Sequence, residues 1–157
     1  MDRTKALASR FREVIFNGTW VAYTNYKDQL TNLPWEMAVM KLHSLNSIAA
    51  LTQHIHYYIQ GVNKVFEDGT LDIKDQYSFD FRPIESQHEW DNILALFWKD
   101  AETFAMHIEK MQDYQLATDF VEAKFGTYQR NLDGMIEHCY YHLGQMVLLK
   151  KMLTRLP

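Results

Sequence analysis

The chain has 157 residues, of which 47% are hydrophobic, and its 16 basic and 20 acidic side chains give a formal net charge of -4. This length supports one hydrophobic core, so we expect a single domain over residues 1–157. The basic side chains are spread along the chain and form no tract that could follow a phosphate backbone. Nucleic acid is therefore not expected as a partner.

The cysteine content and the lack of long apolar runs bear on location. Cys139 is the only cysteine, so no intramolecular disulfide can form and nothing points to an oxidising compartment. The N-terminal residues lack an apolar signal core, and no run approaches the ~18 consecutive apolar residues of a membrane span. We expect a soluble, unprocessed, cytoplasmic protein without a membrane partner.

Helix-period apolar spacing recurs in four places, and only three prolines and six glycines interrupt the chain. The first of these segments predicts a helix from about Thr4 to about Tyr26. Gly18 lies inside it, and because glycine costs about 1 kcal/mol in a helix interior, a kink is expected at Asn17-Gly18.

The next segment contains Pro34 and predicts a short helical turn over residues 35–42. Asn46 or Ser47 can cap a second helix, which should end near Glu67. Residues 70–85 have no helical period and predict a long crossover loop.

The third helix should follow Ser86, which forms a capping box with Glu89 ahead of an apolar stripe. Residues 113–126 are irregular, with a short strand or turn expected near residues 125–128. The fourth helix should run from about Gln129 to about Arg155. Four amphipathic helices with two long connections predict an all-α four-helix bundle.

Three of the seven histidines share a pattern. His138 and His142 stand at i and i+4, so their side chains leave one helix face about 6 Å apart and can close on one ion. With 100° of rotation per residue, the pair lies at the edge of the apolar stripe of its helix. His54 has the same angular offset from the apolar stripe of the second helix. His56 faces away. The periodicity therefore predicts that His54, His138 and His142 meet across a seam of the bundle.

Three neutral imidazoles leave a fourth coordination position open, which is typical of catalytic or ligand-exchanging sites. Zn, Ni, Cu and Fe all suit imidazole, so the ligands do not select the metal. Acceptors for the ring N–H groups could come from Gln145, Asn131, Tyr57 and Tyr58, and Tyr141 should also flank the site. The competing interpretation is that these are hydrogen-bonded boundary histidines that bind no metal, and spacing alone leaves both open.

Other polar groups have simpler interpretations. Cys139 points into the apolar stripe and is expected in the core, while Glu137 turns to the opposite side as a surface charge. No carboxylate can be assigned as a general base, and the catalytic residues stay unknown. Three other histidines have no second histidine at a matching helical position and are expected at the surface or at its boundary with the core: His43, His88 and His107.

The segments SIAALTQH at residues 47–54 and MIEHCYYHLGQ at residues 135–145 resemble the two signature segments of the DinB superfamily of damage-inducible, YfiT-like bundle proteins. The resemblance implies that His54, His138 and His142 hold one divalent ion, with zinc or nickel as the leading candidates. It also implies an up-down-down-up bundle with long crossover connections and a homodimer.

Better understood relatives of this type include mycothiol-dependent maleylpyruvate isomerase and bacillithiol transferases. The resemblance thus implies a metal-dependent thiol S-transferase that uses a low-molecular-weight thiol and a small-molecule substrate. The alternative is a non-catalytic, stress-associated metal-binding protein whose site is structural or vestigial. A pocket beside the metal favours the enzyme, and a site sealed by aromatic side chains favours the alternative. A third hypothesis is an interaction module whose histidines bind nothing.

Overall fold

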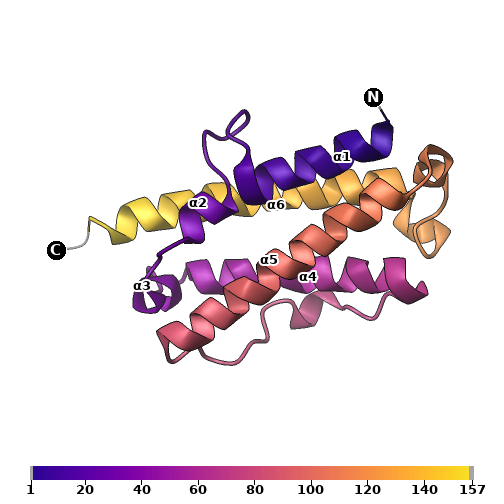
Figure 1. The fold of residues 1–157 in the computed structure, drawn as a ribbon. Coiled ribbons are helices and arrows are strands. Elements are labelled where there is room, and N and C mark those ends of the chain that lie inside the picture. The colour runs from indigo at the N-terminus through magenta and orange to yellow at the C-terminus, as the bar shows by residue number, and fades with distance from the viewer. Residues whose placement is uncertain (1, 156–157) are drawn as a thin grey trace.

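The computed structural model describes residues 2–155, and within this range the chain is all-helical with no β-strand (Figure 1). The α-helices are α1 (Arg3–Arg12), α2 (Tyr26–Leu30), α3 (Trp35–Val39), α4 (Ile48–Asp68), α5 (Gln87–Lys110) and α6 (Tyr128–Leu153). A π-helical turn, η1 (Glu13–Asn17), follows α1 directly, and the 3-10 turns are η2 (Asp75–Tyr77), η3 (Asp113–Ala117) and η4 (Ala123–Phe125). Within the described range, no helix combines the length and apolar character that crossing a membrane requires.

The four longer helices form a closed ring of neighbours, in which α1 contacts α5 and α6, and α4 contacts the same two helices. In Figure 1, α1 and α6 run in one direction, whereas α4 and α5 run in the other. Because α4 and α5 are parallel neighbours, the chain between them must return along the length of α4. The predicted crossover does this, with η2 as its one helical turn.

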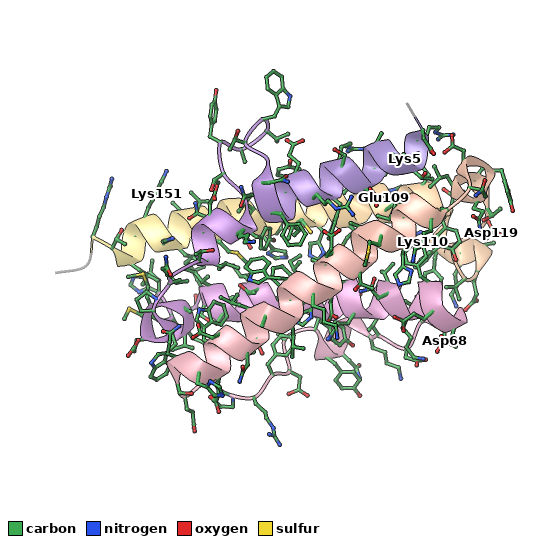
Figure 2. The ribbon with its side chains drawn as sticks, viewed as in Figure 1. Lys5, Asp68, Glu109, Lys110, Asp119 and Lys151 are labelled. Atoms are coloured by element: carbon green, nitrogen blue, oxygen red, sulfur yellow. The ribbon has the colours of Figure 1, made fainter. Side chains whose placement is uncertain are left out.

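The core lies between these helices, and its largest fully buried side chains include Trp90, Tyr26 and Phe11. The Phe11 and Phe104 rings pack with their centroids 4.5 Å apart. Tyr26 donates a hydrogen bond from its hydroxyl to the backbone carbonyl of Cys139 at 2.9 Å, and Cys139 is fully buried as predicted. In Figure 2, charged side chains such as Lys5, Asp68 and Lys151 lie at the outside.

The long helices begin where the sequence predicts caps. Ser47 accepts a hydrogen bond from the Ala50 amide at 3.1 Å, and Ser86 accepts one from the Glu89 amide at 3.2 Å. The Glu89 carboxylate accepts from the Glu85 amide rather than from Ser86, so only half of the predicted capping box forms. These caps fix the starts of α4 and α5 within a residue or two of the predicted positions.

The first helix is shorter than predicted. It widens into the π-helical turn η1 and ends at Asn17, because Gly18 adopts an extended conformation with φ -90° and ψ 152°. A loop follows, and Asn25 then caps α2 by accepting from the Asp28 amide at 2.9 Å while donating to the Gly18 carbonyl at 3.2 Å. The expected kink at Asn17-Gly18 is thus a helix end, stabilised by a polar residue downstream.

The connection between α5 and α6 is irregular, as expected. It contains η3, η4 and one isolated antiparallel bridge between Asp119 and Thr127. Thr127 also caps α6 by accepting from the Arg130 amide at 3.2 Å. This connection folds over one end of the helices and, as shown below, forms a wall of a pocket.

Candidate metal centre

The three predicted histidines lie together across the seam between α4 and α6. His54 comes from the second turn of α4, and His138 and His142 come from successive turns of α6. The Nε2 atom of His138 lies 3.2 Å from that of His54 and 2.9 Å from that of His142. One ligand atom from each residue lies within 4.8 Å of the others, so the cluster could bind a metal ion.

Two of the three rings are fixed by hydrogen bonds at the nitrogen that faces away from the cluster. The Nδ1 atom of His54 lies 3.1 Å from the backbone carbonyl of Ser78, and Nδ1 of His142 lies 2.7 Å from Oε1 of Gln145. Carbonyl oxygens only accept, so each Nδ1 must donate. Each neutral ring then turns an Nε2 lone pair toward His138.

This arrangement leaves an electrostatic conflict that a cation resolves. The Nε2 atom of His138 can donate one hydrogen at most, so at least one of its two close contacts brings lone pairs face to face. Three imidazoles bound to one tetrahedral ion at about 2.0–2.1 Å have nitrogens about 3.4 Å apart. The two distances to His138, 3.2 Å and 2.9 Å, are close to that spacing, and all three ligand atoms lie within 4.8 Å of one another, so the donor set could hold a metal ion.

A proton is a poor substitute for the metal at this position. Burial lowers the pKa of His54 and of His142. Burial, then the neighbouring imidazoles, lower the pKa of His138 to about 4. The cluster is therefore neutral at physiological pH, which is the form that binds metal.

Aromatic rings cover part of the cluster. Phe79 stacks on His54 with ring centroids 4.1 Å apart and an interplanar angle of 10°. Tyr58 presents its ring at a steep angle to His54 at 5.0 Å and to His138 at 5.3 Å. Together these rings shield the His54 side from solvent.

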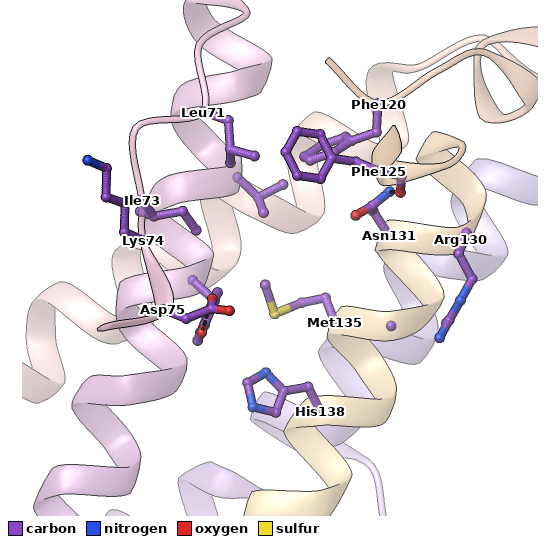
Figure 3. Close-up of a pocket in the computed structure, with 13 residues that line it drawn as sticks. Leu71, Ile73, Lys74, Asp75, Phe120, Phe125, Arg130, Asn131, Met135 and His138 are labelled. Atoms are coloured by element: carbon purple, nitrogen blue, oxygen red, sulfur yellow. Dashed lines mark hydrogen bonds between the residues drawn. The ribbon is translucent and has the colours of Figure 1, made fainter. Parts of the chain in front are cut away.

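The His138 side is open. A pocket of about 670 Å³ begins at His138 and extends between α4 and α6 under the two irregular connections (Figure 3). Asp75 and Tyr58 line it close to the histidine, and the crossover and the α5–α6 connection supply apolar side chains farther along. The site is thus covered on one side and accessible on the other.

Three of the predicted neighbours contact the site. Gln145 accepts the hydrogen bond from His142 described above. Tyr58 packs on two of the rings and donates from its hydroxyl to Oδ1 of Asp75 at 2.8 Å. Tyr141 lies edge-on to His142 at 4.9 Å, although 64% of it is exposed.

The other two predicted neighbours do not hydrogen-bond to the histidines. Tyr57 donates from its hydroxyl to the backbone carbonyl of Lys74 at 3.1 Å and accepts from the Lys74 amide at 2.9 Å, so it anchors the crossover. Asn131 lines the pocket and donates to the Phe125 carbonyl at 2.8 Å. Both side chains satisfy backbone groups of a connection instead of an imidazole.

The structure adds three residues that sequence reasoning did not find, namely Ser78, Phe79 and Asp75. All three belong to the crossover, which has no periodicity from which a facing could be predicted. The acceptor for His54 is moreover a backbone carbonyl, which no residue type encodes. The Tyr-rich stretch of α4 that anchors this loop was the only available signal.

The remaining polar residues behave mostly as expected. His56 points away from the cluster toward α5, where its Nε2 lies 2.7 Å from Asp100. Glu137 is exposed and pairs with Arg130 at 3.1 Å. The three histidines without a matching partner are exposed or half-buried, as predicted: His43, His88 and His107.

Comparisons of this chain with protein-family models, with curated proteins and with solved structures find no match. The resemblance to the DinB superfamily therefore stays a prediction. The function of the site has to be argued from its own geometry.

Proposed function

We propose that this chain is a DinB-like metalloprotein in which His54, His138 and His142 hold one divalent ion, zinc or nickel, and that it catalyses a metal-dependent thiol S-transfer. The observation that carries the proposal is the convergence of the three Nε2 atoms, with the outer two rings fixed so that their lone pairs face inward. Histidines that merely bridge core and solvent have no need of this arrangement.

The accessible side of the cluster favours catalysis over a structural site. Closed structural sites surround the metal with protein ligands, whereas catalytic sites keep a position open. The pocket reaches His138, so a small molecule can approach the point where the three nitrogens converge. The helix directions seen in Figure 1 also agree with the up-down-down-up order that the resemblance implies.

The residues around the cluster have definable tasks in such a reaction. A divalent ion bound there supplies a positive charge that lowers the pKa of a coordinated thiol. Ser78 and Gln145 hold two rings in the orientation that this binding requires. Asp75 is the carboxylate in the pocket wall beside His138, and it is placed to accept the proton that the thiol releases.

The thiol step can be tested with cobalt-loaded protein and 2-mercaptoethanol as the probe. We expect a sulfur-to-cobalt charge-transfer band on thiol addition, and faster formation of the thioether from 1-chloro-2,4-dinitrobenzene, with loss of chloride, than the free thiol gives. His138→Ala should abolish both, whereas His88→Ala, which changes an exposed histidine on α5, should abolish neither. Absence of the band from protein that binds cobalt would contradict thiol activation.

A further inference from the structure

The pocket has two chemically different ends. Near the histidines it is lined by the polar groups of His138, Asp75 and Tyr58. In Figure 3, Leu71, Phe120 and Phe125 lie at the opposite end. The volume of about 670 Å³ lies within the range of ~300–1,000 Å³ that is usual for small-molecule sites.

The apolar end is held in place by its own backbone contacts. Phe120 is buried, packs edge-on to Tyr128 at 5.2 Å, and donates from its amide to the Gly126 carbonyl at 2.8 Å. Asn131 bonds to the Phe125 carbonyl at 2.8 Å. This wall therefore does not depend on a ligand to form it.

The polar side chains nearest Phe120 and Phe125 do not point donors at these rings. The Asn131 side-chain nitrogen donates to two backbone carbonyls, those of Phe125 and Thr127, each at 2.8 Å. Arg130 pairs with Glu137, and in Figure 3 its side chain runs along the outer side of α6. Lys74 is the other cation that lines the pocket, and in Figure 3 its amine lies on the side of the crossover away from Phe120 and Phe125. Against these two rings a charged group would gain no partner, whereas an apolar group would displace water from aromatic surface.

We infer that this pocket binds an amphipathic small molecule that places a polar donor group at His138 and an apolar tail against Leu71, Phe120 and Phe125. The inference rests on the proposed function for the polar end, and on the pocket itself for the apolar end. The substrate class is thus a molecule with an aliphatic or aromatic tail rather than a uniformly polar metabolite.

Gly134 provides a way to block the pocket without disturbing the fold. It lines the pocket on α6, and a Cβ atom added there would approach only the end of the flexible Arg130 side chain, at 3.4 Å. Gly134→Leu should therefore fill the pocket while keeping the helix. Gly144→Leu is the matched control, because Gly144 lies on the same helix outside the pocket and its added Cβ meets nothing within 4 Å.

The first test uses zinc-loaded protein and a series of alkyl hydroxamic acids from acetohydroxamic to octanohydroxamic acid. Each methylene that is fully buried should tighten binding up to about fourfold. Gly134→Leu should remove this dependence on chain length and leave zinc content unchanged, and Gly144→Leu should keep it. Equal affinities for the short and long acids in zinc-loaded wild type would overturn the inference.

The second test separates the inference from the metal. In metal-free protein, the fluorescent probe 1-anilinonaphthalene-8-sulfonate should bind, and Gly134→Leu should weaken it at least tenfold while Gly144→Leu does not. If zinc fails to bind but this result holds, the proposed function fails and the apolar subsite stands. If the wild type binds no probe, or both variants bind as the wild type does, the subsite is refuted.

Discussion

The hydrogen bond from His142 to Gln145 gives the sharpest test of how the site is built. At 2.7 Å it fixes the proton on Nδ1 and leaves the Nε2 lone pair free. Gln145→Met keeps the side-chain length but removes the acceptor. In the metal-bound form, Nδ1–H would then be buried without a partner, at a cost of about 1–3 kcal/mol. In the metal-free form, the proton can move to Nε2 and donate to His138, so the cost is largely avoided.

The penalty therefore falls on binding rather than on folding. We expect Gln145→Met to weaken zinc affinity about 10- to 100-fold, the usual range for losing such an orienting partner. The assay is competition with a fluorescent zinc indicator, alongside urea unfolding in the presence of chelator. Gln145→Glu restores an acceptor and should recover most of the affinity. Wild-type affinity in Gln145→Met would refute the reasoning, as would equal losses in the Met and Glu variants.

Three further predictions concern the metal-free protein. Burial raises the pKa of the Cys139 thiol, so Cys139 should react with a disulfide reagent only after the protein unfolds. Rapid reaction of the native protein would contradict the burial of Cys139 in the core. The pKa of His138 is lowered to about 4 from the usual 6.5, so as the pH falls the unfolded chain takes up a proton at this residue before the folded chain does. The free energy of unfolding, measured with urea, should therefore decrease as the pH drops from 6.5 toward 4. His138→Ala should make this decrease with pH smaller. Gly134→Ala should raise the free energy of unfolding by about 0.5–1 kcal/mol, and a loss of stability would show that the pocket has less room than described.

The fold was predictable where apolar periodicity is long and capped. Ser47 and Ser86 precede apolar stripes that run along helices of 21 and 24 residues, and α4 and α5 begin beside them. The N-terminal helix was predicted too long because its apolar spacing continues past Gly18. The glycine marked the position of the break, but nothing local shows that the chain becomes extended there instead of continuing as a kinked helix. The end of that helix depends on Asn25, seven residues farther on, which bonds back to the Gly18 carbonyl.

The site was predictable to the extent that helices define it. Helical phase selects His54 over His56, and the i, i+4 spacing pairs His138 with His142, so the cluster follows from α4 and α6 alone. The groups supplied by the crossover did not follow. Ser78 contributes a backbone carbonyl whose position depends on how the crossover packs against α4, and that tertiary placement leaves no mark in a single sequence.

The most direct test of the account is the metal content of protein purified without chelator or affinity histidines. Wild type should contain about one equivalent of zinc or nickel per chain, or take it up at micromolar concentration. The double variant His138→Ala, His142→Ala should contain none, and His88→Ala should match wild type. A wild-type protein that contains no metal and takes up neither ion would contradict the metal centre on which the proposed function rests.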